Sequence, residues 1–401
     1  MHADATGRPV ADLVKVFLVL GCRSFGGPVA HLGYFRAELV EKRRWLDDSQ
    51  YADLVALCQS LPGPASSQLV FAVGMNRAGL IGALAASVSF TLPSAALMIA
   101  FAYGAGAAGG AIGAGWLQGL KVAAVAVVAQ AVWAMGQKLC PDGPRVAICA
   151  AAAAALLAFP TGPAQLAVIA AGALAGAWAF RRPAAAGLGP ERRPPRRTRA
   201  AAAAALALFV LLLVALPTLR ALTPSRHVAT FDGFYRAGAM VFGGGHVVLP
   251  LLSAEVVATG WLTNEQFLAG YAAAQALPGP LFTFAGYLGA AMAPGPLAWA
   301  DGLWCLFAVF LPGWLLVAGA LPFWERLRAK PGAQAALAGA NASVVGVLLA
   351  ALYHPVSTEG LRSMTDAVAA GVAFAMLEHA RLPAWLVVLA LALAGQWVLP
   401  H

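Results

Sequence analysis

Long stretches without a charged side chain are the feature that most constrains this sequence. Only 11% of the 401 residues are Asp, Glu, Lys or Arg, whereas soluble domains carry about 25%. So few charges cannot cover a water-facing surface of this size, and 61% of the residues are hydrophobic, with a mean hydropathy of +0.75. The sequence therefore excludes a soluble globular protein and predicts an all-α polytopic protein whose surroundings are the lipid bilayer.

The uncharged stretches have the lengths that membrane crossings require, about 20 residues for a helix. We expect four crossings in each half of the chain and one connecting helix between the halves. The predicted spans are residues 78–103, 112–137, two short helices within 146–180, the connecting helix 200–219, and then 302–323, 331–353, 367–377 and 382–400. The run at 367–377 is short for a crossing and needs its polar flanks to complete it.

Residues 181–199 interrupt this pattern and form the predicted linker between two membrane domains. The stretch holds seven arginines among prolines and glycines. Prolines interrupt a helix, and this many arginines do not enter lipid. Short loops rich in Lys and Arg face the cytoplasm, so we expect the linker there rather than on an anionic partner. The domains are then an N-terminal membrane repeat at 1–180 and, after the linker, residues 200–401 with the connecting helix and a second repeat.

An internal repeat relates the two halves. Residues 40–64 align with residues 256–280 without a gap and are identical at ten of 25 positions, including a Leu-Pro-Gly-Pro motif that ends each segment. Upstream, Phe-Gly-Gly at 25–27 matches Phe-Gly-Gly at 242–244. We infer a duplicated membrane unit, an arrangement that is common in secondary transporters.

Charge asymmetry predicts that the two copies are inverted in the membrane. The loop at 36–44 carries four Lys or Arg residues and its counterpart at 253–265 carries none, whereas 104–118 carries none and its counterpart at 322–335 carries three. Lys and Arg mark cytoplasmic loops, so this reversal indicates opposite orientations. If the Phe-Gly-Gly and Leu-Pro-Gly-Pro segments re-enter without crossing, each repeat has about four to five crossing helices and the C-terminus lies outside. In the alternative, the Phe-Gly-Gly segments cross completely, which changes the count or moves the N-terminus outside.

The Leu-Pro-Gly-Pro motifs predict two helix breaks. The first proline disfavours helix at the residue before it, the glycine permits a sharp turn, and the second proline suits the first turn of a new helix. A new helix N-terminus offers free N–H groups and a partial positive charge, which favour an anion. The candidate substrate-binding residues at the breaks are Gln59, Pro62, Gly63, Pro64, Ser66, Ser67 and Gln68 in the first copy, and Gln275, Pro278, Gly279, Pro280 and Thr283 in the second. The alternative is that the breaks only help helices to pack.

The Phe-Gly-Gly segments and a few polar side chains complete the candidate anion site. Glycines let the backbone approach a ligand, and a cation inside a membrane often marks a substrate pathway. These further candidates are Phe25, Gly26, Gly27, Gly243, Gly244, His246, Arg23 before the first motif, Lys121 inside a predicted span, and Asn341 at the position of Lys121 in the second copy. In the alternative, Arg23 and Lys121 extend to the membrane surface and His246 is a packed core residue.

The sequence offers no pattern for redox or metal chemistry. The five cysteines are scattered without a Cys-x-x-Cys pair, and the seven histidines show no ligand spacing. A nucleic-acid-binding protein would need a clustered basic face or a known module. We therefore expect a transporter without a cofactor or metal, and neither an enzyme nor a partner of nucleic acid. An anion channel is an alternative.

Several motifs of the chain form one set. They are Ser-Phe-Gly-Gly-Pro at 24–28, His31, Arg-Trp-Leu at 44–46 and Ala-Leu-Cys-Gln-Ser-Leu-Pro-Gly-Pro at 56–64, repeated in part in the second half. This set resembles the chromate ion transporter family in its long, two-domain form. The resemblance implies a multi-pass inner-membrane protein that exports chromate with the proton motive force and gives chromate resistance.

The second half departs from the family pattern of the first half. Met240 stands in place of Arg23, and His31 has no counterpart, so we expect unequal contributions from the halves. The residues themselves indicate only a divalent oxyanion, because sulfate has the charge and shape of chromate. The sequence therefore leaves open whether sulfate is a substrate. It also leaves open whether the protein forms a homodimer.

Overall fold

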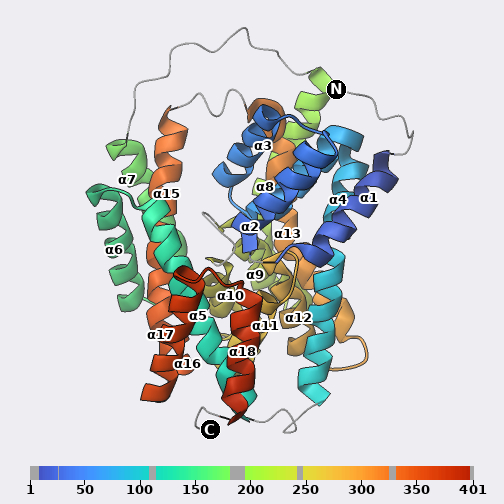
Figure 1. The fold of residues 1–401 in the computed structure, drawn as a ribbon. Coiled ribbons are helices and arrows are strands. Elements are labelled where there is room, and N and C mark those ends of the chain that lie inside the picture. Colours follow the sequence, from blue (N-terminus) through green and yellow to red (C-terminus); the bar gives the residue numbers. More distant parts are fainter. Residues whose placement is uncertain are drawn as a thin grey trace.

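Helices make up nearly the whole of the described chain. The computed structural model describes residues 9–25, 27–107, 114–180, 195–241, 247–324 and 331–397, and it contains no β-strand in those ranges. The elements of the first half are α1 (Pro9–Arg23), α2 (Gly27–Arg36), the π-helical turn η1 (Ala37–Lys42), α3 (Asp48–Ser60), α4 (Ala65–Ala107), α5 (Ala114–Leu139), α6 (Gly143–Ala158) and α7 (Gly162–Ala179). Figure 1 shows the arrangement of these helices.

The second half begins after the connecting helix α8 (Arg196–Leu222). Its elements are α9 (Arg226–Ala239), α10 (Val248–Val256), α11 (Asn264–Ala276), η3 (Leu281–Thr283), α12 (Phe284–Met292), α13 (Ala298–Ala320), η4 (Leu321–Phe323), α15 (Pro331–Ala351), η5 (Leu352–Ser357), α16 (Thr358–Gly360), α17 (Met364–Glu378) and α18 (Ala384–Trp397). The starts of α1 and α8 lie toward the upper end of the molecule in Figure 1, and α18 ends at the lower end.

The prediction of an all-α polytopic membrane protein is confirmed. Five helices in the described chain are long and apolar enough to cross a membrane, and four more apolar helices are shorter. Helix α8 begins at Arg196, inside the stretch predicted to be linker, because Pro195 immediately precedes its first turn. The rest of that linker, residues 181–194, lies outside the described residues, and the repeat orientation stays a prediction.

The first half starts with two helical hairpins whose tips lie inside the protein. Phe17 on α1 packs edge-to-face against Phe35 on α2, with 6.3 Å between ring centroids, so the two helices run antiparallel. The guanidinium of Arg77 on α4 lies 3.9 Å from the Trp45 ring centroid just before α3, so α4 returns to the end where α3 begins. With 13 residues, α3 extends about 20 Å, too short for the roughly 30 Å hydrocarbon core.

Helix α4 itself reverses direction about a third of the way along its 43 residues. Ala78 and Gly79 have non-helical backbone angles, and Gly79 has a φ of +63°. Gly74 then packs directly against Gly82 and Ala83, residues that would be about 12 Å away in a straight helix. The predicted span at 78–103 therefore starts at this reversal, and residues 65–77 form the returning arm of the α3 hairpin.

The second half contains hairpins at the equivalent places. The Tyr287 hydroxyl on α12 donates to the Gln266 carbonyl oxygen on α11 at 2.9 Å, so α12 runs back along α11. Gly289 packs against the backbone of Asp301 and Gly302 at the start of α13. This contact matches the one between Gly74 and the segment Gly82–Ala83 in the first half.

Each half packs its long helix against the last two helices of the other half. Helix α5 lies against α17 and α18, and α15 lies against α6 and α7. Glycines permit these close approaches, because a Cβ at Gly119 would overlap the Leu391 carbonyl oxygen and a Cβ at Gly176 would overlap that of Ala335. Small residues at interfaces are the usual means of helix packing in membranes.

We predict that Gly119→Ala destabilises the protein, because the new methyl group must displace α18. A matched control is Gly371→Ala on α17, where no heavy atom lies within 4 Å of the added Cβ. Overpacking of this kind costs about 1–3 kcal/mol. Apparent melting temperatures of the purified variants in detergent test this, and equal values for the two variants would contradict the packing assignment.

Candidate functional site

The tips of the hairpins from the two halves meet and exchange backbone hydrogen bonds. The Gly63 N–H donates to the Val241 carbonyl oxygen at 2.6 Å, and the Gly279 N–H donates to the Ser24 carbonyl oxygen at 2.9 Å. Gly63 and Gly279 are aligned glycines of the two Leu-Pro-Gly-Pro motifs, and Ser24 and Val241 each precede a Phe-Gly-Gly motif. Each half therefore supplies the donor of one contact and the acceptor of the other.

The local sequence explains the shape of both Leu-Pro-Gly-Pro tips. Leu61 and Leu277 have nearly the same extended angles, with φ near −90° and ψ near 150°, as expected before proline. Gly63 and Gly279 have φ of +125° and +101°, which an L side chain rarely adopts. The preceding helices α3 and α11 both begin with a capping box, Asp47 with Gln50 and Thr263 with Gln266.

A helical segment begins directly after each Leu-Pro-Gly-Pro tip. Helix α4 begins at Ala65, one residue after the first tip, and η3 leads into α12 after the second tip. Ser66, Ser67 and Gln68 in the first turn of α4 are buried. Free N–H groups and the helix dipole make such a first turn favourable for an anion.

The polar side chains at the tips differ in whether all of their polar atoms have hydrogen-bond partners. The Gln68 side-chain amide donates to the Pro62 carbonyl oxygen at 2.7 Å, but its Oε1 is buried without a partner, as is the Ser67 hydroxyl. The Thr283 hydroxyl donates to Pro280 at 2.8 Å, and Gln275 is hydrogen-bonded to Tyr271. Pro64 and Pro280 are buried, Pro278 is half-buried, and Gln59 is exposed at the end of α3.

The described residues of the first Phe-Gly-Gly segment lie beside these tips. Arg23 is the last residue of α1 and is exposed. The Phe25 ring lies 5.8 Å from the Trp385 ring on α18, and Gly27 begins α2 with a φ of +76°. The other candidates in these segments, Gly26, Gly243, Gly244 and His246, lie outside the described residues.

Lys121 lies away from the junction. The Lys121 Nζ is 3.4 Å from Glu265 Oε1, which also accepts a bond from Arg362. The Lys121 ammonium lowers the pKa of Glu265, and Arg362 adds to this effect. Glu265 is the second residue of α11, 12 residues before Leu277, so Lys121 lies about 18 Å along that helix from the tip. Asn341 is half-buried on α15, and the role of both residues stays a prediction.

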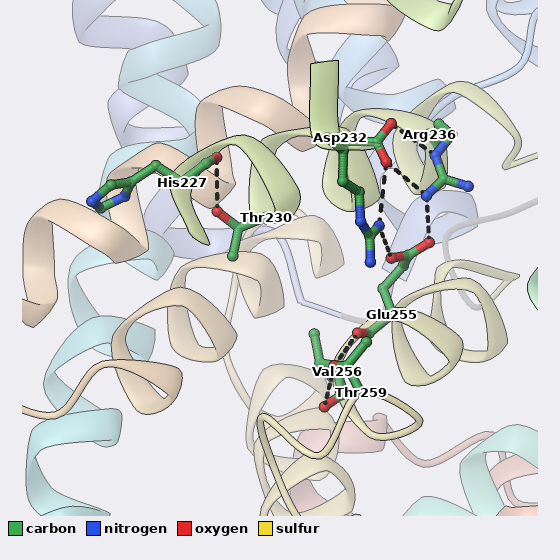
Figure 2. Close-up of polar contacts among 8 residues, drawn as sticks. His227, Thr230, Asp232, Arg236, Glu255, Val256 and Thr259 are labelled. Carbon is green, nitrogen blue, oxygen red and sulfur yellow. Dashed lines mark hydrogen bonds and ion pairs between the residues drawn. The ribbon is translucent and has the colours of Figure 1, made fainter. Parts of the chain in front are cut away.

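A closed ring of ion pairs, which was not predicted from the sequence, joins α8, α9 and α10. Arg220 on α8 and Arg236 on α9 each contact both Asp232 and Glu255, with N–O distances of 2.8–3.2 Å. Figure 2 shows Asp232, Arg236 and Glu255 pointing toward one another. The Asp232 side chain is 1% exposed. The spacing of Asp232 and Arg236, four residues apart on one helix, was the available signal.

Comparison with known proteins identifies the family. The chromate transporter family model matches this chain twice, at residues 11–177 and 228–396. The chain belongs to the chromate transporter family. It is a multi-pass membrane transporter rather than an enzyme. Because both halves match the same model, the family signal covers the duplicated unit as well as the whole chain.

Named relatives cover most of the chain. A "Chromate transport protein" of Pseudomonas aeruginosa is 30% identical over 97% of this chain and 92% of the relative. A "Chromate transport protein" of Cupriavidus metallidurans is 28% identical over 85% of this chain and 81% of the relative. An "Uncharacterized transporter YwrA" of Bacillus subtilis is 30% identical over 43% of this chain and 96% of its own length. No solved structure matches the chain.

We predict that Arg236→Leu destabilises this transporter strongly, because it leaves Asp232 buried with one partner instead of two. Breaking a buried pair costs about 3–5 kcal/mol. The control is Lys42→Met, which removes an exposed partner of Glu38 and costs about 0–1 kcal/mol. Melting temperatures in detergent measure the difference, and a small effect of Arg236→Leu would mean that the ring does not hold α8, α9 and α10 together.

Proposed function

We propose that this chain is a secondary transporter that exports chromate across the cytoplasmic membrane and thereby gives chromate resistance. The observation that carries the proposal is the meeting of two broken hairpins, each with a glycine N–H bonded to the other half. Breaks of this kind near the midplane form the substrate sites of many secondary transporters. The names of the relatives support chromate as the substrate.

The chemistry of the junction suits a divalent oxyanion. Transfer of an uncompensated dianion into an apolar interior costs tens of kcal/mol. The first turn of α4, the unpaired Ser67 hydroxyl and the guanidinium of Arg23 are groups that offset this cost. These groups recognise charge and tetrahedral shape, which sulfate shares with chromate, so selectivity is an outcome that experiment must assign.

An inverted repeat would explain how the site changes sides. The reciprocal contacts of Gly63 and Gly279, the double family match and the reversed loop charges support two units of opposite orientation. In such transporters one unit moves against the other around a fixed site. We propose that residues 36–44 and the arginine-rich linker lie on the cytoplasmic side. We also propose that the proton motive force drives transport.

We predict that inside-out vesicles containing the protein accumulate chromate when a proton motive force is imposed, and that an uncoupler abolishes the accumulation. Vesicles without the protein are the control. Flux equal to that control would contradict the proposal. Flux that only equilibrates chromate along its own electrochemical gradient would indicate a channel instead. Competition by sulfate, measured in the same vesicles, assigns the selectivity.

We predict that Arg23→Gln lowers chromate transport at least tenfold, because a cation is lost beside the tip where the dianion binds. The matched control is Lys15→Gln on the same helix, an exposed cation about 12 Å nearer the start of α1. Vesicle flux, normalised to the amount of folded protein, is the measurement. Equal flux in the two variants would remove Arg23 from the site.

A further inference from the structure

His31 lies one hydrogen bond from the contact between the two halves. It is 1% exposed on α2, and its Nε2 is 3.0 Å from the Ser24 carbonyl oxygen. A carbonyl oxygen only accepts, so Nε2 carries the hydrogen. The same oxygen accepts the Gly279 N–H at 2.9 Å. The imidazole and the second half therefore share one acceptor atom.

The surroundings of His31 leave its other nitrogen without a partner. The Phe35 and Phe90 rings lie 6.1 and 5.7 Å from the imidazole, and both Nδ1 of His31 and the Ser24 hydroxyl are buried and unpaired. A proton on Nδ1 would place a positive charge among aromatic rings, at a cost that a nearby anion offsets.

Few charged groups face His31 from the elements around it. On α1 the charged residues are Asp12 and Lys15 toward its start and Arg23 at the tip. On α2 the charged residue is Arg36, which pairs with Glu41 and Asp48 in an exposed position. Helix α3 contacts α2 through the Tyr51 hydroxyl, which donates to the Leu32 carbonyl oxygen, and its titratable residues are Asp48, Tyr51, Asp53 and Cys58. Helix α4 has no charged residue after Arg77, and the Leu-Pro-Gly-Pro tip at 277–280 has none. A change of charge on His31 is therefore compensated chiefly by what binds at the junction.

His31 is also distinct among the described residues of the tips. In residues 20–25, 27–31, 59–68, 237–241, 247–251 and 275–284 the titratable side chains are those of Cys22, Arg23 and His31. Of these, the imidazole is the side chain whose ordinary pKa lies closest to neutral pH. The second half has Val248 at the aligned position, so the imidazole acts on the Ser24 contact alone.

We propose that His31 is the group through which a proton acts on the anion site. The imidazole is neutral when the junction is empty, and it takes up a proton on Nδ1 when the divalent anion binds. The proton comes from water on the side where the anion binds and returns to water on the side where the anion leaves. Dianion and proton together carry one net negative charge, so the membrane-potential component of the proton motive force drives their export. This inference rests on the proposed transport of a divalent oxyanion. Because linkage is reciprocal, proton binding raises anion affinity by the same factor as anion binding raises proton affinity.

The test compares the wild type with His31→Gln, whose side-chain amide retains a donor for Ser24 but does not titrate. Chromate itself takes up a proton in the same pH range, and this affects both proteins equally. The quantity compared at each pH is therefore the KM of the variant for chromate flux into vesicles divided by the KM of the wild type. We expect the variant-to-wild-type ratio to rise several-fold, up to about tenfold per pH unit, from about pH 8 to about pH 6. The control is His379→Gln, because His379 is exposed. The KM of this variant divided by that of the wild type should not change with pH.

A second measurement covers a His31→Gln protein that folds but does not transport. Chromate is added to purified protein in weak buffer, and proton uptake is recorded. Wild type should take up more protons per bound chromate than His31→Gln does. A constant KM ratio, or equal proton uptake, would overturn the role of His31. Failure of the wild type to bind or transport chromate at all would instead overturn the proposed function.

Discussion

The need to pair backbone N–H and C=O groups away from water governs this structure. A helix that breaks inside a membrane leaves such groups free, and each unpaired group costs several kcal/mol. Here the Gly63 N–H is paired with Val241 and the Gly279 N–H with Ser24, so each half satisfies a break in the other. The long helices are exchanged between the halves in the same way. Helix α5 of the first half packs on α18 of the second half, and α15 of the second half packs on α7 of the first half. Neither half forms its junction alone.

The two hairpin pairs have equivalent backbones but different charges. The hairpin of α1 and α2 carries Arg23 and His31, whereas the second half has Met240 and Val248 at the aligned positions. Glu255 of the second half joins a ring with Arg220, Asp232 and Arg236, whereas its counterpart Glu38 pairs with nearby Lys42 and Arg43 on its own segment. Ion pairs therefore tie α10 to α8 and α9 in the second half, and the titratable histidine belongs to the first half.

Sequence patterns predicted the features that depend on neighbouring residues. The Leu-Pro-Gly-Pro breaks, the left-handed glycines and the apolar helices are local consequences of proline, glycine and uncharged runs. The reversal of α4 at Ala78 and Gly79 was placed only as the start of a span, because a single glycine in an apolar run does not distinguish a kink from a turn. The ion ring was missed because Arg220 and Glu255 are 35 residues apart, and the partner of Lys121 was missed because Glu265 lies in the other half.

The sequence by itself determined that the chain enters a membrane, that it contains two copies of one unit, and where each copy breaks. These properties follow from composition and from the backbone limits of proline and glycine, which act within a few residues. The tertiary structure decided which break contacts which carbonyl, which candidates gather at the junction and which do not. Those pairings depend on helices more than 170 residues apart, such as Gly63 with Val241. The packing of the whole bundle fixes their distance, and no local pattern encodes it.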